Sequence, residues 1–153
     1  MDIQIRNASA TDAPAIRNTI INALRESNAR DYSSEIIEQV VRSFSAPAVM
    51  KMLTERQVIV ATVDGHVVAT ASLQANTIRS VFVDPNYQAK GIGRQLMERI
   101  ESLAANAGLS ILSVPSSITA EGFYASLGFR KIRDEFHQSE RTTIMMKTLK
   151  RQR

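Results

Sequence analysis

The chain contains no cysteine among its 153 residues, which excludes disulfide frameworks, thiolate nucleophiles and cysteine metal sites. It has two histidines, His66 and His137, neither with a second ligand at metal-binding spacing, so no metal is expected. No stretch approaches the roughly 20 apolar residues that span a bilayer, and the N-terminus lacks the features of a signal peptide. These absences predict a soluble, cytoplasmic protein with no membrane partner.

Tryptophan is also absent and aromatic residues make up 5% of the chain, which leaves few side chains on which nucleic-acid bases could stack. The formal charge is +4, however, and part of this excess lies in the C-terminal segment K-T-L-K-R-Q-R. Such a tail could bind nucleic acid or could simply be exposed to solvent. The positive net charge of the chain would also favour a polyanionic cofactor. Nucleic acid is the least favoured of these partners.

The length and the 44% apolar content suit one hydrophobic core, and no repeat or glycine-rich linker divides the chain. We therefore expect a single domain over residues 1–153. A strand is predicted at Ile3–Arg6, followed by a helix that Thr11 or Asp12 caps. The buried stripe of this helix is formed by Ile16, Ile20 and Leu24.

A second helix is predicted to begin at Ser33 or Ser34 and to end before Pro47, with a short helical turn over Val49–Thr54. β-Branched residues then predict three strands, with a tight turn at Asp64-Gly65 between the first two. These strands are Gln57–Val63, Val67–Leu73 and Thr77–Val83.

Helical spacing returns at Ile92 and ends near Asn106-Ala107-Gly108. Four short elements follow: a strand at Leu109–Val114, a helix at Thr119–Leu127, and strands at Phe129–Arg133 and Thr142–Leu149. The segment between the last two strands is Asp134–Glu140. The order β-α-α-β-β-β-α-β-α-β-β predicts an α+β domain with a mixed sheet.

The most informative stretch is V-F-V-D-P-N-Y-Q-A-K-G-I-G-R-Q-L-M, Val81 to Met97. A strand ends at a proline, and two glycines open an amphipathic helix after a short loop. Exposed amides and the positive end of the helix dipole make such a junction an anion site. Lys90 and Arg94 add positive charge, so the sequence predicts a phosphate or pyrophosphate ligand.

Two common phosphate loops do not fit these residues. A Walker loop requires Lys-Ser/Thr after its last glycine, but Arg94-Gln95 follows Gly93. A dinucleotide fingerprint requires glycine at the position of Leu96. The stretch instead resembles the Q/R-x-x-G-x-G/A loop of the GNAT superfamily of N-acetyltransferases through Gln88, Gly91 and Gly93. The downstream segment F-Y-A-S-L-G-F, Phe123 to Phe129, is similar to a second motif of that family.

The resemblance implies a GNAT-like acyl-CoA N-acyltransferase fold: a mixed, mostly antiparallel sheet with helices on both faces, splayed where acetyl-CoA enters. It implies that the strand residues Val81, Phe82 and Val83 pair through their backbone with the pantetheine arm. Backbone amides of the loop would hold the pyrophosphate, through Gln88, Ala89, Lys90, Gly91, Ile92, Gly93 and Arg94. Ser117 stands where the family often has asparagine and retains a hydroxyl for the pantetheine.

The same resemblance implies a catalytic role for Tyr124 as the general acid that protonates the leaving thiolate. No residue is assigned as the general base. The strand Thr77–Val83 carries no carboxylate, and the other candidates are more often surface residues. These candidates are Glu26, Glu35, His66, Glu135 and His137.

The expected function is transfer of an acetyl group from acetyl-CoA to a primary amine, without a covalent enzyme intermediate. The alternatives are a non-catalytic acyl-CoA-binding module on the same fold and a nucleic-acid-binding protein that uses Lys147–Arg153. The acceptor, a small-molecule or protein amine, would be bound by the N-terminal helices, the loop after the second helix and Asp134–Glu140. Dimerisation is common on this architecture, so a homodimer is compatible with the sequence.

Overall fold

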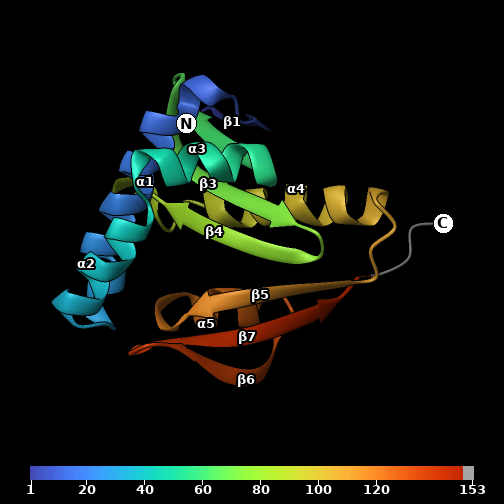
Figure 1. Ribbon diagram of the computed structural model, residues 1–153. Helices are drawn as coiled ribbons and strands as arrows, with labels where there is room; N and C mark the ends of the chain where they lie inside the picture. Colours follow the sequence, from blue (N-terminus) through green and yellow to red (C-terminus); the bar gives the residue numbers. More distant parts are fainter. Residues whose placement is uncertain (150–153) are drawn as a thin grey trace.

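The computed structural model describes residues 1–149, which form a seven-stranded sheet flanked by helices (Figure 1). The strands are β1 (Ile3–Asn7), β2 (Gln57–Val63), β3 (His66–Gln74), β4 (Thr77–Val83), β5 (Ile111–Ser117), β6 (Arg130–His137) and β7 (Glu140–Thr148). The α-helices are α1 (Ala13–Glu26), α2 (Ser34–Ser43), α3 (Ala46–Glu55), α4 (Ile92–Asn106) and α5 (Glu121–Ser126). Short 3-10 turns connect them at η1 (Ala10–Asp12), η2 (Asn28–Arg30), η3 (Pro85–Tyr87) and η4 (Ile118–Ala120).

The strand order is β1-β2-β3-β4-β5-β7-β6, and every neighbouring pair is antiparallel except β4 and β5. The central strands β2 and β3 are buried along almost their whole length, because helices cover both faces of the sheet. The fold class expected from the sequence is therefore confirmed. No helix within residues 1–149 has both the length and the apolar character that crossing a membrane requires.

Each face of the sheet has its own hydrophobic core. On one face, α4 and α5 pack against the strands through Ile92, Leu96, Ile100 and Tyr124. On the other face, α1, α2 and α3 bury a second cluster against Val58 and Val60 of β2. The predicted stripe of α1 lies in this second cluster, fully or almost fully buried: Ile16, Ile20 and Leu24. Burial of such side chains contributes about 1.5–3 kcal/mol each.

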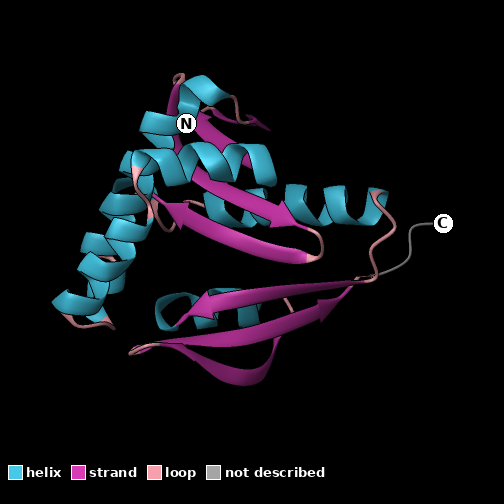
Figure 2. Cartoon of the chain, viewed as in Figure 1, coloured by secondary structure: helices cyan, strands magenta, loops and turns pink. Residues whose placement is uncertain are grey.

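The two parallel strands β4 and β5 pair at one point, between Thr77 and Ser113. A further main-chain bond there runs from the Ser113 amide to the Asn76 carbonyl, 3.0 Å. Beyond this point the strands diverge, with β1–β4 on one side of the opening and β5, β7 and β6 on the other (Figure 2). Both facing edges therefore carry main-chain groups that no strand of the described chain satisfies.

The structure corrects one predicted helical element in the N-terminal half. Residues 46–55 form a complete helix, α3, where the sequence predicts only a short turn over Val49–Thr54. Pro47 lies in the first turn of α3, where its missing N–H costs nothing, and the Ser45 hydroxyl accepts a hydrogen bond from the Ala48 amide at 3.3 Å. Pro47 therefore belongs to the first turn of α3, in addition to following the end of α2.

The structure also corrects two strands in the C-terminal half. The predicted strand Phe129–Arg133 continues to His137, and the turn to β7 is limited to residues 138–139. The prediction was too short because β6 is an edge strand, exposed along most of its length, and shows no clear apolar alternation. β5 runs to Ser117 through Pro115, which is tolerated there because β4 no longer pairs with β5 at that level.

Asp12 fastens the start of α1 to β1. Its carboxylate accepts bonds from both terminal nitrogens of Arg6, at 2.8 and 2.9 Å, and from the Ser9 amide at 2.8 Å. The Arg6 guanidinium lowers the pKa of Asp12 to about 2; burial opposes this shift, and the Ser9 amide adds to it. Its stabilising effect is therefore present above the ordinary aspartate pKa of about 4 and is lost as the pH falls through about 2.

The Asp12→Asn variant should lose about 1–2 kcal/mol of unfolding free energy near neutral pH, because Arg6 is half-exposed and part of the interaction is screened. Urea titrations should show this difference shrinking as the pH falls below about 4. Asp64→Asn is the control, because Asp64 lies in the exposed β2–β3 turn and makes no ion pair within residues 1–149. A deficit in Asp12→Asn that stays constant down to low pH would contradict the assignment.

Candidate active site

A cavity of about 840 Å³ opens where β4 and β5 diverge. Its walls come from the end of α1, from α2, from the start of α4 and from both diverging strands. Every site residue predicted from the sequence lines this cavity except Lys90: Val81, Phe82, Val83, Gln88, Ala89, Gly91, Ile92, Gly93, Arg94, Ser117 and Tyr124. Residues from widely separated parts of the chain thus meet in one place.

The loop before α4 presents a row of free main-chain donors. No amide from Ala89 to Arg94 donates a hydrogen bond to another described residue, and the next one, Gln95, donates to the Gly91 carbonyl. Ala89 and Gly91 both have positive φ, +60° and +81°, and alternation of this kind turns successive amides toward one side. Together with the positive end of α4, these amides form a site suited to an anion.

Lys90 and Arg94 are exposed beside this loop and have no acidic partner within residues 1–149. The Gln88 side chain turns inward, and its Nε2 donates to the Ser27 hydroxyl at 2.8 Å and to the Val83 carbonyl at 3.2 Å. Gln88 thereby fixes the loop to α1 and to the end of β4. The positive charges stay on the outside, where a polyanion could reach them.

The two glycines of the motif are required for different reasons. Gly91 adopts a left-handed conformation that side chains resist, and a Cβ there would meet nothing within 4 Å. A Cβ at Gly93 would lie 3.2 Å from the Phe123 ring. Close packing of α4 against α5 thus accounts for glycine at position 93, whereas backbone conformation and an open surface account for it at position 91.

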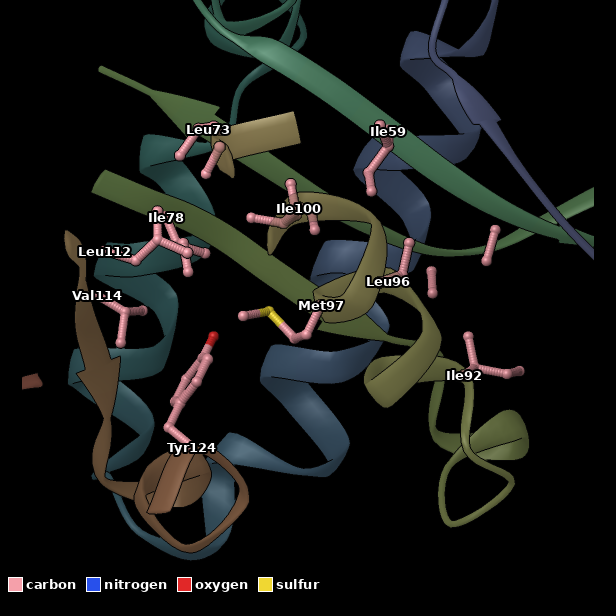
Figure 3. Close-up of a cluster of buried hydrophobic side chains, with 14 of the residues drawn as sticks. Ile59, Leu73, Ile78, Ile92, Leu96, Met97, Ile100, Leu112, Val114 and Tyr124 are labelled. Atoms are coloured by element: carbon pink, nitrogen blue, oxygen red, sulfur yellow. The ribbon is translucent and has the colours of Figure 1, made fainter. Parts of the chain in front are cut away.

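Tyr124 lies in the wall of the cavity with its ring in the core. The ring makes edge contacts with Phe123 and Phe129, with centroids 5.2 and 5.6 Å apart, and the residue is 4% exposed. Figure 3 shows the hydroxyl pointing away from α5, toward the space between Val114 and Met97. It makes no hydrogen bond to any described residue, and burial raises the pKa of Tyr124 well above its usual value. The phenol therefore stays protonated at any physiological pH.

β4 carries an irregularity where it faces the cavity. Thr70 and Ser72 of β3 pair with Phe82 and Arg79 of β4, so β4 has one extra residue, and Ser80 within it has φ +54°. A bulge of this kind turns main-chain groups out of the ladder and is common beside active sites. Val81 and Val83 pack toward the α4 side, whereas Phe82 packs on Phe44 from the other side, 5.8 Å between centroids.

Ser117 ends β5 on the opposite wall. Its hydroxyl oxygen accepts a hydrogen bond from the Ala120 amide at 3.2 Å and so caps the turn η4. Its hydroxyl proton is not donated to any residue of the described chain. Ser117 can therefore cap the turn and donate to a ligand at the same time.

Four further charged residues line the cavity: Arg30, Arg56, Arg79 and Glu140. Arg30 and Glu140 lie in the segments expected to bind the acceptor, whereas the sequence reasoning missed Arg56 and Arg79. The sequence shows only isolated charges at Arg56 and Arg79, and their location in the cavity follows from the fold. Glu140 is half-buried, and burial raises its pKa while His137 acts in the opposite direction. Of the base candidates considered from the sequence, His137 alone lines the cavity, and Glu26, Glu35, His66 and Glu135 do not.

Similarity to known proteins agrees with this geometry. Residues 28–150 match the family model described as an acetyltransferase (GNAT) domain. The chain is 26% identical over 134 residues to a protein named as an uncharacterized N-acetyltransferase, YafP, of Escherichia coli, covering 88% of this chain and 85% of that protein.

Solved structures give the same result. The crystal structure of a GCN5-related N-acetyltransferase from Rhodopseudomonas palustris superposes with a TM-score of 0.93 at 25% identity over 97% of both chains. The PaiA N-acetyltransferase of Thermoplasma acidophilum, solved in complex with coenzyme A, superposes with a TM-score of 0.82 at 22% identity over 97% of this chain and 99% of that one. With its splayed sheet, its glycine-opened helix and a matching family model over most of its length, the chain belongs to the GNAT family of acetyltransferases.

Proposed function

We propose that the protein transfers an acetyl group from acetyl-CoA to a primary amine, with both substrates meeting in the cavity between β4 and β5. The observation that carries this proposal is the row of free amides from Ala89 to Arg94 at one end of the cavity that Tyr124 lines. These amides, with Lys90 and Arg94, suit the pyrophosphate of coenzyme A. The coenzyme A bound to the structurally similar enzyme from Thermoplasma acidophilum supports the same choice of ligand.

The unpaired edge of β4 suits the pantetheine arm. Within residues 1–149, Val81, Phe82 and Val83 have no strand partner on the side that faces β5, so their main-chain groups are free to bond the amides of an extended chain. Ser117 offers its hydroxyl proton from the opposite wall. An arm held in this way points its thioester toward the interior of the cavity, where Tyr124 lies.

The chemistry requires one bond to form and one to break. The amine nitrogen attacks the thioester carbonyl carbon, and a main-chain N–H on the free edge of β4 stabilises the oxygen that gains negative charge. When the carbon–sulfur bond breaks, Tyr124 donates its proton to the thiolate and recovers one from solvent. The nitrogen loses a proton to Glu140, directly or through water, because Glu140 is the carboxylate that lines the cavity within the described chain. The products are an N-acetylated amine and coenzyme A.

The test combines calorimetry with a transfer assay. The protein should bind acetyl-CoA and, with an accepted amine, release free thiol at a rate that depends on both substrates. Thiol release should stop when the amine is left out, since no covalent acetyl-enzyme is formed. Binding without transfer to any amine in a broad panel would identify a non-catalytic acyl-CoA-binding module, and absence of binding would refute the proposal altogether.

The basic C-terminal segment does not contribute to this proposal. Its residues 150–153 lie outside the part of the chain that the structure describes. Lys147, the first residue of the segment, forms an ion pair with Glu101 of α4 at 2.9 Å. This lysine is thus engaged with α4, and it does not line the main cavity.

A further inference from the structure

Arg56 occupies an unusual position at the junction between α3 and β2. Its side chain reaches along the α3 side of the sheet to β4, where Nη1 donates to the Ser80 hydroxyl at 3.1 Å and more weakly to Ser72 at 3.4 Å. The Ser72 hydroxyl in turn donates to the Arg79 carbonyl at 2.6 Å. Arg56 thereby contacts the bulge of β4 and lines the cavity beside it.

The guanidinium of Arg56 forms no ion pair with any residue of the described chain. No carboxylate of the described residues lies within 4.0 Å of it, and its buried Nε has no hydrogen-bond partner. Burial lowers the pKa of Arg56, the positive charge of Arg79 lowers it further, and Glu55 acts in the opposite direction. A half-buried cation beside a second cation is unfavourable unless something else compensates it.

The charges around the cavity indicate that an anion would compensate the charge of Arg56. Arg30, Arg56 and Arg79 line the side bounded by the N-terminal helices and β4, and Glu140 is the cavity's carboxylate within the described chain. The free amides from Ala89 to Arg94 supply a separate anion site on the α4 side of the sheet. When the phosphates of the acetyl donor are bound at those amides, Arg56 therefore remains available to bind a different anion.

We propose that Arg56 binds a carboxylate of the acceptor, so that the accepted amines carry a carboxylate, as amino acids do. This inference rests on the proposed acetyl transfer and adds the class of the second substrate. A guanidinium forms strong charge-assisted hydrogen bonds with a carboxylate, and an incoming carboxylate would also offset the repulsion between Arg56 and Arg79. The Ser80 hydroxyl holds the guanidinium beside the β4 bulge, so the anchored acceptor lies close to the free edge of β4.

The first experiment compares acceptors that differ only at the carboxylate. Thiol release is measured with a set of amino acids, with the matching amino-acid amides and with the amines that lack the carboxyl group. We expect kcat/KM to be about 10- to 100-fold higher for the acids, the range that a hydrogen-bonded charge supplies. Equal kcat/KM values for each amino acid, its amide and its amine would overturn the inference while leaving acetyl transfer intact.

The second experiment uses Arg56→Met, which retains much of the volume and removes the charge. The KM for carboxylate acceptors should rise about 10- to 100-fold, so that acids and amides become similar, while the KM for acetyl-CoA is unchanged. Because an uncompensated charge is removed, the thermal midpoint of the free protein should stay the same or rise. Arg99→Met, on the exposed face of α4 and outside the cavity, should leave all three quantities unchanged.

The results of the two experiments distinguish a structural role of Arg56 from a failure of the proposed function. Loss of thermal stability in Arg56→Met with an unchanged preference for acids would give Arg56 a purely structural role and overturn the inference. Arg56→Lys provides a second variant: it keeps the charge on a shorter side chain and should retain part of the preference. A protein that binds acetyl-CoA but acetylates no member of the sets overturns the proposed function and, with it, this inference.

Discussion

Replacing Gly91 by aspartate is expected to weaken acetyl-CoA binding at least about 100-fold, or roughly 2.8 kcal/mol. The carboxylate would stand beside the free amides of the loop, compete for them and repel the pyrophosphate. The left-handed conformation of Gly91, with φ +81°, adds a backbone cost of about 1–2 kcal/mol to the variant. Calorimetric titration of the purified variant with acetyl-CoA measures the effect directly.

The backbone cost can be separated from the effect of charge. Gly108 has φ +79° at the other end of α4, and a Cβ there would also meet nothing within 4 Å. Gly108→Asp should therefore lose similar thermal stability and bind acetyl-CoA as the wild type does. The alanine variants at both positions complete the comparison. If Gly91→Asp binds acetyl-CoA as well as Gly108→Asp does, the anion site does not lie at this loop.

The Tyr124→Phe variant should lose about 100-fold or more in kcat, the usual size of a general acid's contribution. The ring contacts to Phe123 and Phe129 survive the change, and the hydroxyl has no hydrogen-bond partner within residues 1–149 to lose. Stability and the affinity for acetyl-CoA should therefore stay close to those of the wild type. Steady-state kinetics with an accepted amine, across a range of pH, gives the measurement.

Tyr32→Phe is the matched control for the loss of a phenol. The Tyr32 hydroxyl donates to the Arg141 carbonyl and accepts from the Ile118 amide, both at 2.8 Å, so it joins the N-terminal half to β7 and η4. Its removal should cost about 1–2 kcal/mol of stability and change kcat by less than about threefold. A Tyr124→Phe enzyme that keeps kcat within a few-fold of the wild type at every pH would exclude Tyr124 as the acid.

Much of the fold was predictable because its elements repeat simple patterns. The apolar spacing of Ile16, Ile20 and Leu24 and the β-branched run Gln57–Val63 each indicate one structure, and the bounds of β2 and β4 match the prediction. The prediction for β6 was too short because an edge strand needs no buried face. Packing therefore constrains neither the apolar pattern of β6 nor its length. Its end at His137 follows from pairing with β7, which the sequence does not display.

The cofactor end of the candidate site was more predictable than the acceptor end. Gln88, Gly91 and Gly93 lie within six consecutive positions, so a short sequence motif can identify the loop to which they belong. Arg56 and Ser80 come together only because a helix end and a strand bulge are neighbours in three dimensions. A lone arginine in a sequence carries no sign that its counter-charge is missing, since that property depends on every side chain around it.

The single pairing point of β4 and β5 has a consequence for inhibition. Two strand edges that face each other across a gap present the same donors and acceptors that an incoming strand would meet at the rim of any sheet. A short extended peptide or a peptidomimetic could therefore occupy this gap without imitating the nucleotide at all. Such molecules would compete with the acyl donor, and their selectivity would come from side chains directed at Phe82 on one side and Tyr124 on the other.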